Sequence, residues 1–165
     1  MSELKKIKVV VKNYDVQGSG DLDALYGRVR LEDEQGQTFY FKQVVMPKYL
    51  KQHGAMAMNV PRTWFYKHVS KKSIVVIAFE NANGKVEYDL SDLQLIARST
   101  VMKGILMTIA AIPMGVIAAT ATYGLGLILI PMGFWYGYRN TFKLPAMLSR
   151  KRILSDFSAY GIEVR

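Results

Sequence analysis

The side chains that could support metal chemistry are few in this chain. It contains two histidines and no cysteine. His53, Met56 and Met58 lie close together in sequence, and an imidazole with two thioethers is a donor set that suits Cu(I). We expect the methionines to fill a loop or the core instead, because three ligands in a chain without cysteine make a thin site. The sequence predicts no metal and no cofactor.

No group of residues has the order or spacing of a catalytic centre. His68 is followed by Lys71 and Lys72, which suits a solvated face better than a general base. Asp21 and Asp23 follow a Gly-Ser-Gly segment that is typical of a polar loop. The sequence contains no phosphate-binding loop, nucleophile elbow or paired-carboxylate motif. It therefore predicts no catalytic residue and a protein that is not an enzyme.

Basic and aromatic residues interleave between residues 40 and 72. Such a set can bind single-stranded nucleic acid, but residues 1–97 carry a net charge of only +3, which is weak for that task. Anionic lipid headgroups, or a protein partner of unknown identity, suit these residues better. The predicted interaction surface consists of Lys48, Lys51, Arg62, Trp64, Tyr66, Lys71 and Lys72.

The strongest pattern in the chain is residues 104–138, which include no charged side chain. A single helix of this length would measure about 52 Å, whereas the hydrocarbon layer of a bilayer is roughly 30 Å thick. Two spans of about 17 residues each would be short but sufficient. The sequence predicts a helical hairpin, with spans at 101–121 and 125–142 and a turn at 120–124.

Basic residues flank this stretch on both sides, and residues 98–165 carry a net charge of +6. Lys and Arg favour the cytoplasmic side of a membrane. We therefore expect a multi-pass protein of the bacterial inner (plasma) membrane with cytoplasmic N and C termini. The start of the chain lacks the apolar core of a signal peptide. Residues predicted at the membrane interface are Tyr123, Trp135, Tyr136, Tyr138, Arg139, Arg150, Lys151 and Arg152.

Small residues recur at four-residue spacing in both predicted spans, and in lipid this spacing lets helices approach closely. They are Ala111, Gly115 and Ala119 in the first span and Gly133 and Gly137 in the second. They can pack the hairpin against itself, which we favour, or join copies into a homo-oligomer. Apart from Lys103 and Arg139 near the span ends, neither span contains Asp, Glu, Lys, Arg or His, which argues against an ion-coupled carrier.

The first 90 residues have the composition of a small β domain. Predicted strands are 7–11, 24–32, 37–45, 73–79 and 85–90, a five-stranded curved sheet or an OB- or SH3-like barrel. Residues 46–72 include a short helix near 47–53 and an extended segment at 64–66, and form a packed crossover or a functional loop. Ser91 or Asp92 is the expected cap of a helix that continues into the first span.

Residues 144–160 form a basic amphipathic pattern, with Met147, Leu148, Ile153, Leu154 and Phe157 on one face. Such a helix can lie on an anionic leaflet or pack on the β domain. Residues 162–165 are expected to form a short extended tail.

Together these patterns predict an α+β membrane protein with three parts: a cytoplasmic β domain (1–97), a two-helix transmembrane hairpin (98–142), and a cytoplasmic amphipathic C-terminal helix with a tail (143–165). The expected role is a non-enzymatic scaffold, assembly factor or regulatory subunit that acts through the β domain. One alternative is an oligomeric channel or transport component formed by the hairpins. Another is nucleic-acid or lipid-headgroup binding by the β domain.

Overall fold

The computed structural model describes residues 3–162 and divides into two compact units. One unit contains the residues up to Ile96 together with those from Ile153 onward, and the other is Ala97–Arg152. The C-terminal helix and the N-terminal sheet therefore belong to the same unit, although the whole second unit separates them in sequence.

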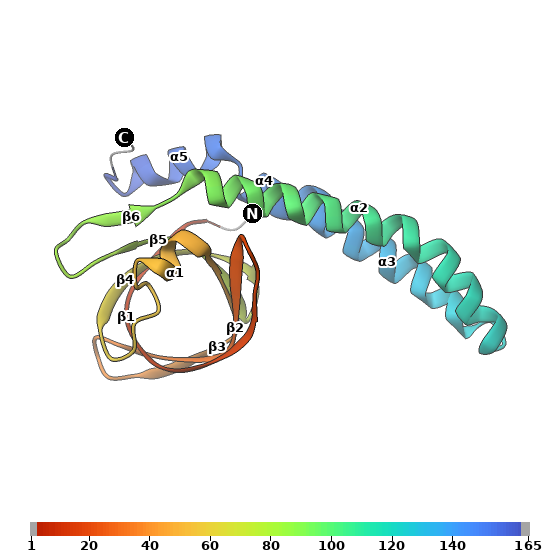
Figure 1. Cartoon of the computed structure of the whole chain (residues 1–165), viewed down its shortest axis with the longest axis horizontal. Helices are drawn as coiled ribbons and strands as arrows, with labels where there is room; N and C mark the ends of the chain where they lie inside the picture. Colours follow the sequence, from red (N-terminus) through yellow and green to blue (C-terminus); the bar gives the residue numbers. More distant parts are fainter. Residues whose placement is uncertain (1–2, 163–165) are drawn as a thin grey trace. The chain divides into compact units, whose positions relative to one another are not determined.

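Five strands of the first unit close into a barrel (Figure 1). They are β1 (Lys5–Ser19), β2 (Asp23–Asp33), β3 (Thr38–Pro47), β4 (Pro61–Ser70) and β5 (Ser73–Glu80). Antiparallel pairs run in the order β3-β2-β1-β4-β5, and β5 closes the ring by pairing in parallel with β3. The short helix α1 (Lys48–Gln52) connects β3 to β4, and β6 (Val86–Tyr88) pairs with β5 outside the ring.

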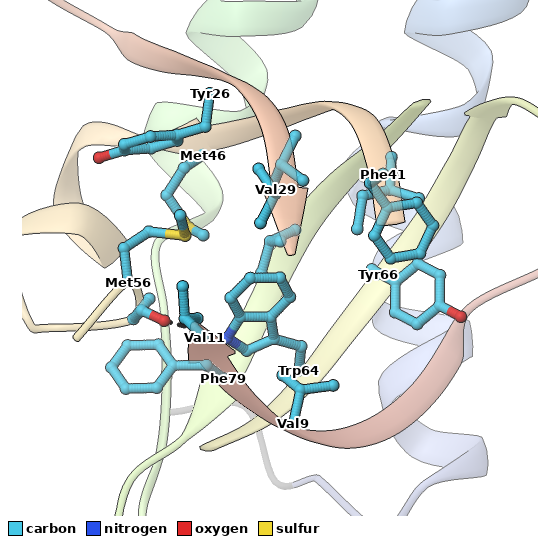
Figure 2. Packing of buried hydrophobic residues seen from close by; sticks show 14 of the residues in the cluster. Val9, Val11, Tyr26, Val29, Phe41, Met46, Met56, Trp64, Tyr66 and Phe79 are labelled. Atoms are coloured by element: carbon cyan, nitrogen blue, oxygen red, sulfur yellow. Dashed lines mark hydrogen bonds between the residues drawn. The ribbon is translucent and has the colours of Figure 1, made fainter. Parts of the chain in front are cut away.

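The barrel core is built from the inward positions of these strands. Val9 and Val11 of β1, Val29 of β2 and Phe79 of β5 surround the Trp64 side chain, which is completely buried (Figure 2). The Trp64 indole N–H donates a hydrogen bond to the backbone oxygen of Ala55, at 3.0 Å. This bond satisfies the only polar group of the indole inside the core and fixes the chain segment that follows α1.

The predicted small β domain is a closed barrel, but its fifth strand differs from the prediction. The sequence pattern predicts only a short extended segment at 64–66 and takes 85–90 as the fifth strand. In the structure β4 spans Pro61–Ser70 and completes the ring, while β6 is limited to Val86–Tyr88. The pattern hides β4 because both of its faces are covered, so no alternation of exposed and buried residues is visible.

Two helical segments cover the outer face of the barrel within the first unit. The start of α2 (Leu90–Ala121) contributes Leu93, which is fully buried. Asp89 caps this helix, because its carboxylate accepts the backbone N–H groups of Ser91 at 2.7 Å and Asp92 at 3.1 Å. The expected cap, Ser91 or Asp92, is therefore wrong by two or three residues. Asp92 instead accepts the backbone N–H of Tyr49.

The other covering segment is α5 (Arg150–Ala159), whose Ile153 and Phe157 are buried. The Phe157 ring meets Tyr88 edge-on, with 5.3 Å between ring centroids. Just beyond the helix, the Tyr160 hydroxyl donates to the backbone oxygen of Leu4, at 2.9 Å. Two environments were predicted for this apolar face, an anionic leaflet and the β domain. In the structure, Ile153 and Phe157 are buried within the β-domain unit.

A buried ion pair joins α5 to β4. Lys67 is completely buried on the outer face of β4, because it follows Tyr66, which points into the core. The Lys67 ammonium lies 2.5 Å from the Asp156 carboxylate of α5. A buried ammonium without a counter-charge is strongly destabilising, so this pair links the stability of the barrel to the presence of α5.

The second unit is a helical hairpin followed by a short helix. Its first helix is α2 from Ala97 onward, which contains Pro113 and ends at Ala121. Gly124 adopts a positive φ of 94° in the turn, where its N–H bonds to the Ala119 oxygen at 2.8 Å. The chain then continues through η1 (Leu125–Ile128), α3 (Leu129–Tyr138), the π-helical η2 (Arg139–Lys143) and α4 (Leu144–Met147).

The amphipathic helix predicted over 144–160 is not continuous. It is interrupted at Leu148 and Ser149, between α4 and α5. Of its five predicted apolar-face residues, Met147 and Leu148 lie in the second unit and the other three in the first. The predicted tail lies, apart from Ile162, outside the described residues.

Candidate functional site

The apolar side chains of the second unit are mostly exposed. Leu106 is 66% exposed, Ile117 70% and Trp135 69%. A helix pair in water would turn such side chains towards each other. Here large apolar residues surround the hairpin on its outside. Among the described helices, α2 alone is long and apolar enough to cross a membrane, by length and composition.

The helices of the hairpin meet through their small residues. A side chain on Gly133 would come within 2.3 Å of the Ala111 Cβ, and one on Gly137 within 1.8 Å of the Thr108 hydroxyl. One on Gly126 would meet the backbone of Ala118 and Ala119 at 2.3 Å. All five residues predicted for helix packing lie at this intrachain contact, Gly115 against Ile130 and Ala119 against Gly126. Gly104 and Gly126 also lie there. The sequence pattern did not predict them, because neither is four residues away from one of those five residues.

The predicted interface residues lie at several places. Tyr123 is fully exposed in the hairpin turn. Trp135, Tyr136 and Tyr138 are exposed on α3, and Arg139 begins η2. The Lys143 ammonium lies 5.9 Å from the centre of the Trp135 ring. Arg150 and Lys151 are exposed at the start of α5, and Arg152 is half-buried.

The barrel carries a cluster of cations around one exposed aromatic ring. Arg30 of β2 is paired directly with Tyr40 of β3, and Tyr40 is 61% exposed. Lys42 follows on the same face of β3, and its backbone N–H bonds to the Lys72 oxygen at 2.8 Å. Lys71 and Lys72 are exposed in the β4–β5 turn. We call this cluster the basic face: Arg30, Tyr40, Lys42, Lys71 and Lys72.

The structure brings together only part of the predicted interaction surface. Trp64 and Tyr66 are buried in the core and cannot contribute to a surface. Lys48 and Lys51 are exposed on α1. Only Lys71 and Lys72 join the basic face. The other members of the basic face occupy alternate strand positions. Tyr40 and Lys42, for example, alternate with the inward Phe39 and Phe41, and this two-residue period is the signal that identifies them.

Arg62, the remaining predicted surface residue, is half-buried beside a hollow that Lys6 and Lys8 also line. Its guanidinium lies 5.8 Å from the centre of the Phe79 ring. The two lysines are paired with acids: Lys6 with Glu80 at 3.6 Å, and Lys8 with Glu34 at 2.6 Å. The hollow is therefore close to electrically balanced, which makes it a weaker anion site than the basic face.

A polar cluster links α1 to β6. The Tyr49 hydroxyl donates to the Glu87 carboxylate at 3.0 Å, and the Lys85 ammonium lies 2.8 Å from that carboxylate. The bond from Lys85 holds the pKa of Glu87 below its ordinary value, while burial raises the pKa of Tyr49. Both shifts lead away from neutral pH, where a general acid or base would have to titrate. The cluster is therefore suited to joining two elements.

Replacing Glu87 with glutamine should weaken the acid sensitivity of the fold. A lowered folded-state pKa stabilises the protein above the ordinary value of 4.5, and that contribution disappears as the pH falls through the folded pKa. We expect Glu87→Gln to lower the melting temperature at neutral pH. The difference in melting temperature between the variant and the unaltered protein should become smaller in the acid range. Thermal melts from neutral pH to about pH 3 measure this. A gap that is independent of pH would contradict it.

The side chains of His53, Met56 and Met58 do not come together as a set of metal ligands. The His53 ring stacks on Tyr49 at 3.9 Å between centroids, Met56 is buried in the core, and Met58 is exposed. Residues 3–162 contain no group of three or more His, Cys, Asp or Glu side chains placed to hold a metal. No protein family, curated protein or solved structure matches this chain.

Proposed function

We propose that the protein is a non-enzymatic adaptor of the bacterial inner membrane. Its hairpin is embedded in the bilayer, and its barrel is held at the cytoplasmic surface as an interaction module for a protein partner. The second unit supports the membrane part of this proposal, because large exposed apolar side chains surround a contact made of glycine and alanine.

One observation carries the topology. The chain enters the second unit after Ile96 and leaves it before Ile153, and the residues on both sides belong to one folded unit with a shared core. A folded unit cannot lie on two sides of a membrane. Any membrane segment between these residues must therefore enter and leave through the same face. Basic residues at both ends, such as Lys103 and Lys143, support the proposal that this face is the cytoplasmic one, because Lys and Arg favour that side.

The barrel supports the role of interaction module. Its strand order, its parallel β3–β5 closure and its helix between β3 and β4 support an OB-like architecture, which hosts many binding functions. The polar cluster around Glu87, with its hydrogen bond and its ion pair, joins α1 to β6, which is a structural role. A channel would need helix faces free to line a pore, whereas the small-residue faces are occupied within the hairpin.

The topology can be tested by site-directed labelling, because the chain has no cysteine of its own. Gln35→Cys places a thiol in the exposed β2–β3 loop, and Thr122→Cys places one in the hairpin turn. In intact cells with a permeable outer membrane, a maleimide that cannot cross the inner membrane should label Cys at 122 only. Cys at 35 should react only after the inner membrane is opened.

Inverted vesicles provide the control. In them, the same maleimide should label Cys at 35 and not Cys at 122. Equal labelling of both positions in intact cells, or of neither, would overturn the topology and with it the adaptor. Recovery of the protein in the soluble fraction without detergent would do the same.

A further inference from the structure

The basic face carries charge that the rest of the barrel does not balance. None of its four cations forms an ion pair or side-chain hydrogen bond with a described residue. Neighbouring cations on the same sheet are neutralised: Lys12 lies 3.1 Å from Glu32, and Arg28 pairs with Asp15. The pairing of Arg30 with Tyr40, and the backbone bond from Lys42 to Lys72, hold the cations together. The face is therefore built to meet a polyanion.

The single exposed aromatic ring of the basic face, Tyr40, helps to distinguish nucleic acid from lipid headgroups as the polyanion. Single-stranded nucleic acid is held by several aromatic side chains, on which successive bases stack. Here the neighbours of Tyr40 along β3, Phe39 and Phe41, turn towards the core. One tyrosine among four cations instead suits a membrane surface, where tyrosine lies at the level of the headgroups and Lys and Arg meet lipid phosphates.

We propose that the basic face docks the barrel onto anionic phospholipid headgroups of the membrane that holds the hairpin. This inference rests on the proposed function, which tethers the barrel to that membrane. The tether keeps the headgroups at high effective concentration, so that weak contacts suffice for docking. Each cation near an anionic leaflet contributes an attraction equivalent to about a five-fold change in the docked-to-free ratio, and salt screens it.

The experiment uses the full chain in nanodiscs of phosphatidylcholine alone or enriched in phosphatidylglycerol. Thr38→Cys, exposed two residues before Tyr40, carries an environment-sensitive fluorophore. Asn83→Cys in the exposed β5–β6 turn carries the control label. We expect the emission of the label at 38 to shift to the blue in phosphatidylglycerol discs only, and to return in high salt. The label at 83 should not respond.

Charge variants test the residues. Lys42→Gln with Lys72→Gln should lower the docked-to-free ratio by about 25-fold, two factors of five. The matched double variant, Lys5→Gln with Lys48→Gln, removes the same charge elsewhere on the barrel and should leave the ratio near that of the unaltered protein. Equal losses in the two variants would mean general attraction by net charge and would overturn docking through the basic face.

A second readout separates this proposal from the one on which it rests. Quenching of Trp135 by brominated acyl chains reports insertion of the hairpin in either lipid. Quenching without a response at position 38 overturns the docking alone, whereas absence of quenching overturns the membrane anchor as well. A response at 38 to a single-stranded oligonucleotide, with none to phosphatidylglycerol, would assign the basic face to nucleic acid and overturn the lipid proposal.

Discussion

Asp156→Ala is expected to lower the free energy of unfolding of the barrel unit by roughly 3–5 kcal/mol, the range for breaking a buried ion pair from one side. The substitution leaves the Lys67 ammonium in the interior without its carboxylate partner. It also frees α5 from β4, so part of the loss should come from the apolar contacts of Phe157. Denaturation of the full chain in detergent, followed through Trp64 fluorescence in a Trp135→Phe background, measures it, because the chain has only these two tryptophans.

The control removes both charges. Lys67→Met combined with Asp156→Leu replaces the pair by apolar groups of similar size and should recover most of the lost stability, because no buried charge remains. If the double variant were as unstable as Asp156→Ala, the loss would come from packing of α5 and the ion pair would contribute little. A stable single variant would contradict the buried position of Lys67.

Gly126→Ala is expected to open the hairpin. The added methyl group would lie 2.3 Å from backbone atoms of Ala118 and Ala119, and backbone cannot turn aside as a side chain can. We expect a loss at or above the upper end of the about 1–3 kcal/mol typical of overpacking. The midpoint of a dodecyl sulfate titration, followed by circular dichroism, measures the stability of the helix pair.

Gly115→Ala is the matched control on the other helix. Its methyl group would meet the side chain of Ile130, at 2.5 Å from the nearest carbon, and a side chain can adopt another rotamer. A smaller loss is therefore expected, with the mass of the folded protein in native mass spectrometry unchanged. If either substitution instead produced a stable protein of smaller mass, the small residues would form contacts between chains, and the channel interpretation would take precedence.

The sequence alone distinguished a β-rich N-terminal segment from a long apolar segment, but not the grouping of the C-terminal helix with the N-terminal sheet. An uncharged stretch with basic flanks is a property of composition, and it can be read without any tertiary information. The strands β2, β3 and β5 were predicted to within about two residues, since their patterns arise from one buried face or two. The helix reversal near Gly124 was also predicted, because residues 120–124 are the least apolar part of the uncharged stretch.

The closure of the barrel needed the tertiary structure. β4 presents Trp64 and Tyr66 to the core and Phe65 and Lys67 to the covering helices, so its sequence shows neither alternation nor a purely apolar run. From the sequence pattern alone, Lys67 would be expected to be exposed to solvent. Asp156, almost ninety residues later in the chain, supplies a counter-charge for this buried lysine.

The surfaces were decided in the same way. An apolar helical face fits lipid and protein equally well in sequence, and contact with the barrel decided the environment of α5. Trp64 and Tyr66 were expected at a surface because aromatic and basic residues alternate there, yet they fill the core. The basic face joins residues of β2, β3 and the β4–β5 turn, which the parallel β3–β5 pairing brings together. A sequence pattern shows which face of a helix or strand is apolar. Which element packs against that face is decided by the fold.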